Sequence, residues 1–181
     1  MVPLRLHAFV SAPRERVFDA IADMAARPSW TDHYMRDLRL ENPRSAGVGA
    51  AARYRLDAPF YRHWVETEIV EADRPRRVVE ATRAARLGRT GGEVSYELTP
   101  HGGSITRIEM TIWRESGTPR ERVQERLGFR PWLRRQTKKA LERLREQLEE
   151  HPDEPLERVT VAGWEPLRGP RFGISTRATR G

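Results

Sequence analysis

The sequence contains no cysteine, and this absence removes several kinds of chemistry at once. Without a thiol the chain can form no disulfide, no thiolate nucleophile and no cysteine-ligated zinc site. A chain without cysteine is also typical of the reducing cytosol. Long apolar runs are missing too. No stretch approaches the ~20 residues that span a bilayer, and the first residues lack the apolar core of a signal peptide. We therefore expect a cytoplasmic protein with no membrane span.

Lysine is nearly absent. Only Lys138 and Lys139 are lysine, so 31 of the 33 basic residues are arginine. The formal net charge of +7 therefore comes from arginines, and these are spread along all 181 residues rather than gathered in one segment. Binding to a polyanion usually needs basic residues clustered on one face. The composition does not favour a nucleic-acid partner.

Common catalytic and cofactor motifs are also missing. No GxxxxGK[ST] or GxSxG string occurs, and the five histidines have no metal-ligand spacing. The string GVGAAA at residues 47–52 matches GxGxxA. However, the strand expected before it is half exposed, and Asn42 and Pro43 interrupt the approach to the first glycine. Turn glycines explain this string better. The sequence predicts no metal and no cofactor.

The clearest pattern in the chain is an amphipathic helix within residues 117–150. Thr118 and Pro119 are typical of a helix start, and Gly128 and Pro131 predict an early break or kink. After that point the apolar positions recur at steps of three and four. They are Leu133, Thr137, Ala140, Leu141, Leu144 and Leu148. Such a stripe needs an apolar surface to cover it, and the sheet expected from the preceding residues would provide one.

The residues before this helix show the period-2 alternation of strands. We expect strands at residues 4–10, 35–41, 50–58, 61–72, 77–86, 93–99 and 104–114. A helix is expected at residues 13–24, with a short helix or turn at 25–34. The connections between successive strands are too short for crossover helices, so the sheet should be antiparallel. The pattern predicts an α+β fold, with helices on one face of a curved sheet.

Several local strings then suggest a family. They are VSAPRERVFDAIAD at residues 10–23, PSW at 28–30, GVGAA at 47–51, DRP at 73–75 and TPHGGSI at 99–105. Their order resembles the SRPBCC superfamily, also called START-like, helix-grip or polyketide cyclase/dehydrase-like. The resemblance covers roughly residues 3–149 and implies six to seven strands wrapped on a long C-terminal helix, with a deep cavity between them. The Cys/His pattern of the oxygenase branch is missing.

The domain organisation follows from these patterns. Residues 1–150 are predicted to form the helix-grip domain. Residues 151–181 contain four prolines and four glycines without sustained periodicity. This composition predicts a mostly disordered tail, in which Trp164 and Phe172 could dock on the domain or on a partner. The sequence makes no prediction about oligomeric state.

The expected inner wall mixes apolar residues with hydroxyl and imidazole groups. These polar groups either face a cavity that holds water or a ligand, or pair with the backbone and with one another. The residues expected to bind a ligand are Tyr54, His63, Val65, Thr67, Tyr96, Leu98, Ile108, Met110, Thr137, Leu141 and Leu144, with Trp30 and Phe60 near an entrance. The aromatic residues around Trp30 could equally plug one end of the core.

The function best supported by this reading is binding of a small hydrophobic molecule, such as a lipid, a polyketide or an aromatic metabolite. One alternative is an aromatase/cyclase-like or dehydratase-like enzyme for a polyketide-type substrate, in which His63 or a tyrosine carries a proton. His63 could also be a wall residue without a catalytic role. A second alternative is an interaction protein that uses the tail or the basic helix. The basic candidates are Arg130, Arg134, Arg135, Lys138 and Lys139.

Overall fold

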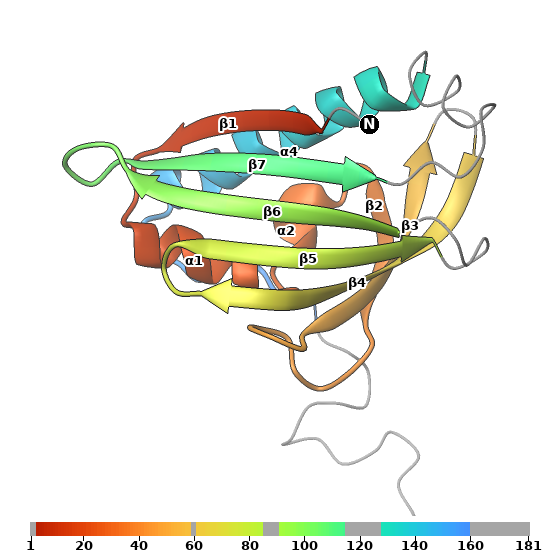
Figure 1. Cartoon of the computed structure of the whole chain (residues 1–181). Coiled ribbons are helices and arrows are strands. Elements are labelled where there is room, and N and C mark those ends of the chain that lie inside the picture. The colour runs from red at the N-terminus through yellow and green to blue at the C-terminus, as the bar shows by residue number, and fades with distance from the viewer. Residues whose placement is uncertain (1–2, 59–60, 85–90, 115–127, 160–181) are drawn as a thin grey trace, which may run out of the picture.

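The computed structural model describes residues 3–58, 61–84, 91–114 and 128–159 of the chain (Figure 1). The strands are β1 (Leu4–Val10), β2 (Met35–Leu40), β3 (Ala51–Ala58), β4 (Tyr61–Asp73), β5 (Arg77–Ala84), β6 (Gly91–Pro100) and β7 (Thr106–Arg114). The helices among these residues are α1 (Arg14–Ala22), α2 (Pro28–Thr31) and α4 (Arg130–Glu150).

The strands form one antiparallel sheet in the order β1-β7-β6-β5-β4-β3-β2. Figure 1 shows the sheet curling at the β2–β3 end, with α1, α2 and α4 all on one side of it. The helix-grip fold predicted from the sequence is therefore confirmed. The register also places apolar side chains side by side on the inner face, since Tyr96 is opposite Met110 and Leu98 is opposite Ile108.

The long C-terminal helix α4 spans Arg130–Glu150, and residues 117–127 of the predicted helical segment lie outside the described residues. Within the described residues α4 begins at Arg130, and Pro131 lies in its first turn, where a missing backbone N–H leaves no hydrogen bond broken. The predicted break or kink at Gly128 and Pro131 stays a prediction, because the chain before Gly128 lies outside the described residues. Thr118 and Pro119 lie outside the described residues. The apolar stripe is buried as expected, apart from the half-buried Leu133, and α4 packs chiefly against β1 and α2.

Strand β6 begins two residues earlier than the sequence suggested. Gly92 precedes the strand expected at residues 93–99, but it pairs with Arg114 of β7. A Cβ atom at Gly92 would lie 2.7 Å from the Thr82 hydroxyl and 2.8 Å from the Trp113 carbonyl oxygen. The glycine is needed here because neighbouring strands approach too closely for a side chain. Gly47 and Gly49, by contrast, are turn glycines with φ of 74° and 84°.

The nine residues after α4 lie against the domain. Arg16 of α1 donates hydrogen bonds to the carbonyl oxygens of His151 and Glu154. Leu156 packs on the core, and the Val159 amide donates to the Ala25 carbonyl at 2.8 Å. The first part of the expected tail therefore docks on α1 and the segment after it. Residues 160–181, with Trp164 and Phe172, lie outside the described residues, so the prediction of a mostly disordered tail stays a prediction.

Candidate functional site

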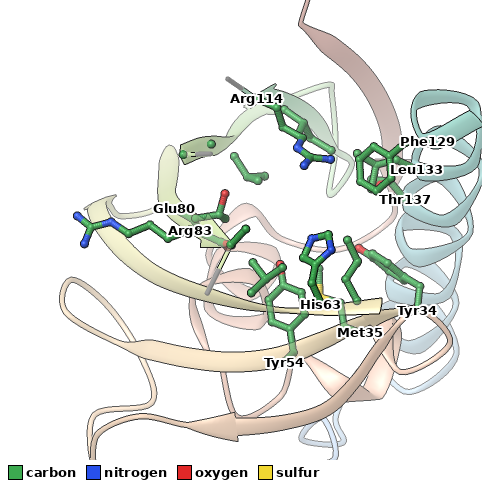
Figure 2. A pocket seen from close by; sticks show the side chains of 18 of the residues that line it. Tyr34, Met35, Tyr54, His63, Glu80, Arg83, Arg114, Phe129, Leu133 and Thr137 are labelled. Atoms are coloured by element: carbon green, nitrogen blue, oxygen red, sulfur yellow. The ribbon is translucent and has the colours of Figure 1, made fainter. Parts of the chain in front are cut away.

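A cavity lies between the inner face of the sheet and the first half of α4 (Figure 2). Most of its wall is apolar and comes from both the sheet and the helix. These side chains are Met35, Leu56, Val65, Val94, Met110, Ile112, Phe129 and Leu133. An internal space with apolar walls and a few polar groups is the usual form of a small-molecule site.

The enclosed part of this cavity is modest. The centre of a water-sized sphere can occupy about 80 Å³, and the whole space between the lining atoms, open mouth included, is about 680 Å³. The enclosed volume of about 80 Å³ exceeds the ~10–15 Å³ that one water molecule needs. The cavity can therefore hold several water-sized groups.

Polar side chains converge on the cavity from elements far apart in the sequence. They come from the segment before β2, from strands β3 to β7 and from α4: Tyr34, Tyr54, His63, Glu80, Tyr96, Arg114 and Thr137. In Figure 2 the His63 ring stands near the middle of the space, between Tyr54 and Arg114. The antiparallel register causes this convergence, because it puts alternate residues of every strand on the inner face.

A buried ion pair supports one side of the cavity. Arg27 and Glu80 are 2% and 3% exposed, and two hydrogen bonds join them. Arg27 Nη2 donates to Glu80 Oε1 at 2.5 Å, and Nη1 donates to Oε2 at 3.3 Å. Burial alone would lower the pKa of Arg27, but the charge of Glu80, the hydrogen bond to it and the nearby Tyr96 and Tyr34 together raise the pKa. The guanidinium therefore stays charged inside the protein.

Neighbouring groups form hydrogen bonds with most of the remaining polar atoms of the Arg27–Glu80 pair. Arg27 Nη2 also donates to the Ile21 carbonyl at 2.8 Å, near the C-terminal end of α1. The Tyr96 hydroxyl accepts from Nη1 at 3.3 Å, and Thr67 donates to Glu80 Oε2 at 3.4 Å. The Arg27 guanidinium carbon lies 4.9 Å from the centroid of the Trp30 ring. The pair thus ties α1, α2, β4, β5 and β6 together.

The cavity tyrosines remain protonated at neutral pH. Burial raises the pKa of Tyr34, Tyr54 and Tyr96, and the negative charge of Glu80 adds to each rise. The positive charge of Arg27 acts in the opposite direction without reversing it. A protonated phenol can donate a hydrogen bond as well as accept one. The wall therefore offers hydroxyl donors to whatever occupies the cavity.

His63 is a neutral imidazole in this setting. Burial lowers its pKa from the ordinary value of 6.5, and the positive charge of Arg114 lowers it further. A neutral imidazole carries one N–H donor and one basic nitrogen. It can therefore orient a ligand or accept a proton from it.

Arg114, at the end of β7, also lines the cavity, in the row next to Glu80, Val94 and Ile112 on the inner face of the sheet. Its guanidinium carbon lies 4.2 Å from the centroid of the Phe129 ring, so one face of the cation covers an aromatic surface. Its Nη1 atom is buried and has no hydrogen-bond partner in the part of the chain that the structure describes. Figure 2 shows the guanidinium pointing into the space above His63.

The sequence matches a known family over the whole of this architecture. Residues 1–149 match the family described as polyketide cyclase / dehydrase and lipid transport. The chain belongs to this family. The resemblance to the SRPBCC superfamily seen in the sequence is thereby confirmed. Among curated proteins, no sequence matches the chain significantly.

Solved structures share the fold of this polyketide cyclase / dehydrase family member at low sequence identity. The KanY protein, solved by NMR, is 19% identical with a TM-score of 0.63, covering 81% of this chain and 97% of its own. A protein of Thermus thermophilus is 18% identical with a TM-score of 0.62 and the same coverage. Major latex-like protein 151 of Panax ginseng is 10% identical, with a TM-score of 0.57, covering 81% and 96%. These similarities establish the fold alone.

The structure separates the predicted wall residues of this family member into two groups. Those that line the cavity are Tyr54, His63, Val65, Tyr96, Met110 and Thr137. Those that lie in the packed interior beside it are Trp30, Thr67, Leu98, Ile108, Leu141 and Leu144. Trp30, expected near an entrance, is 2% exposed and lies against Arg27. Phe60 lies outside the described residues.

Sequence reasoning missed the three charged residues of the site, Arg27, Glu80 and Arg114. For two of them the sequence pattern does indicate an inward-facing charge. Glu80 follows Val78 and Val79 in an apolar run, and Arg114 continues the inward alternation of β7. A charge at an inward position of a strand costs free energy unless it is paired or functional. Arg27 lies in a connector after Met24–Ala26. Neither the strand period nor the helix period predicts there which way its side chain points.

Three further observations concern functions other than ligand binding: metal binding, membrane insertion and surface interaction through α4. The described residues contain no group of three or more His, Asp or Glu side chains placed to hold a metal ion. No helix within the described ranges is long and apolar enough to cross a membrane. On α4, Arg134, Arg135, Lys138 and Lys139 are exposed, whereas Arg130 is half buried and donates to the Pro3 carbonyl.

Proposed function

We propose that this protein binds a small, mostly apolar molecule in the cavity between the sheet and α4. The observation that carries the proposal is the composition of the wall. Apolar side chains from β2 to β7 and α4 surround a small set of polar groups, and two of these, Glu80 and Tyr96, are held in place by Arg27. The apolar surface supplies affinity through burial, and the fixed polar groups supply orientation.

We expect native mass spectrometry of the protein from its own host to show a reproducible apolar or aromatic adduct. A Val94→Phe substitution, which fills the cavity from β6, should abolish the adduct. The adjacent Glu93→Phe substitution adds the same ring to an exposed position and should leave it intact. Circular dichroism would establish that both variants fold. A clean unliganded mass, with no thermal shift across lipids and polyketide-like aromatics, would refute the proposal.

A second candidate function is favoured by the state of His63. This imidazole faces the cavity, and its pKa is lowered by burial and by Arg114, so it is unprotonated at neutral pH. A neutral base inside an apolar cavity could remove a proton next to a carbonyl group, as cyclisation or dehydration of a polyketide-type chain requires. The cavity would then act as a template for the substrate as well.

If the protein is such an enzyme, His63→Ala should lower kcat by roughly 10²–10⁴-fold while binding of a product-like aromatic is largely retained. The wild-type rate should stay constant through neutral pH. It should fall only as the pH drops below the ordinary imidazole pKa of 6.5, because protonation of His63 removes the base. His33→Gln is a matched control, since His33 also has a lowered pKa but lies outside the cavity lining. Equal turnover in His63→Ala and wild type would exclude this role.

A further inference from the structure

The polar groups of the cavity are mostly hydrogen-bond donors. Tyr54 and Tyr96 keep their phenolic protons because burial raises their pKa. Arg114 can only donate. A ligand that pairs with Arg114 must therefore bring acceptor atoms to it.

The acid among the described lining residues, Glu80, is not available as an acceptor. Arg27 binds both of its oxygens, and Thr67 donates to one of them. The same contacts neutralise its charge with a buried cation. Of the two arginines among the described lining residues, Arg114 points into the space, whereas Arg83 is exposed and points away from it in Figure 2.

Arg114 has the features of an unfilled anion site. No ion pair to it is found within the described ranges, and its buried Nη1 atom has no hydrogen-bond partner there. The Phe129 ring covers one face of the guanidinium, which leaves the in-plane N–H groups free to point toward a ligand. An unsatisfied buried N–H destabilises the protein, and an anionic acceptor would remove this cost.

We propose that the ligand of this cavity is a carboxylate, whose acidic group binds Arg114 while its apolar body lies between Val94, Met110 and Leu133. This inference rests on the proposed binding function and narrows it from apolar molecules in general to apolar acids. The planar guanidinium fork matches the two oxygens of a carboxylate. His63, next to Arg114, can donate to the same group or to a neighbouring carbonyl.

The test compares three probes of similar shape, 2-naphthoate, 2-naphthamide and naphthalene, by isothermal titration calorimetry with the full chain. The wild type should bind the naphthoate about tenfold or more tightly than the naphthamide. Arg114→Gln should lose most of this preference with little change in affinity for the naphthamide. Arg114→Lys keeps the charge without the fork and should fall between the two. Arg135→Gln, at an exposed arginine of α4 outside the cavity lining, should behave as wild type.

Each contrary result separates the two proposals. Equal binding of naphthoate and naphthamide by the wild type would overturn the carboxylate inference and leave apolar binding intact. The carboxylate inference also fails if Arg114→Gln and Arg114→Lys weaken both probes equally, because Arg114 would then only shape the wall. Failure of all three probes to bind would overturn both proposals.

Discussion

Replacing Glu80 with leucine is expected to lower the free energy of unfolding by about 3–5 kcal/mol, because the substitution leaves the Arg27 guanidinium charged, buried and without its counterion. The reverse substitution, Arg27→Leu, should cost a similar amount by isolating the carboxylate. Both side chains are nearly inaccessible to water, so solvent cannot replace the lost partner. Urea denaturation followed by circular dichroism measures both effects.

The double variant Arg27→Leu/Glu80→Leu should be much less destabilised than the sum of the two single variants. Removing both charges also removes the desolvation penalty that each imposes in the other's absence. A control comes from Arg74 and Asp19, which form a similar two-bond pair at 2.8 and 2.9 Å on an exposed surface. Asp19→Ala should change stability little, because water screens such a pair. If Glu80→Leu cost no more than Asp19→Ala, burial would not be what makes the inner pair important.

Truncating the apolar side chains of α4 should destabilise the protein by different amounts in the two halves of the helix. Leu144 is 0% exposed and lies in the packed half, so Leu144→Ala should cost about 2–5 kcal/mol through lost apolar burial and a new void. Leu133 lies about three helical turns earlier, is half buried and lines the cavity. Leu133→Ala should cost less, because it enlarges a space that already exists.

Ligand affinity provides an independent test on the same two variants. Leu133→Ala should change affinity for apolar probes, since it alters the wall they touch. Leu144→Ala should leave affinity nearly unchanged once the variant is measured well below its unfolding midpoint. If the stability costs ranked in the opposite order, the division of α4 into a cavity-lining half and a packed half would be wrong.

Local pattern was enough to predict the main elements of this fold. Strand alternation, turn residues and the stripe of α4 are short-range properties, and they follow directly from the periods of 2 and 3.6 residues. The inward faces of β3, β4, β6 and β7 were predicted for the same reason, and with them the presence of Tyr54, His63 and Tyr96 on the inner side. The antiparallel order of the sheet followed from the short connections.

The sequence by itself therefore determined the elements, their order and their inner faces, whereas tertiary structure alone decided which inner residues enclose a space. Leu133 and Leu144 belong to one stripe and look alike in sequence, but only the path of α4 across the curved sheet puts the first beside a cavity and the second in packed core. Arg27 and Glu80 lie 53 residues apart, on a connector and a strand, and no local period relates them. Their pairing and the isolation of Arg114 arise from three-dimensional proximity, because electrostatic energy depends on distance and burial rather than on position in the chain.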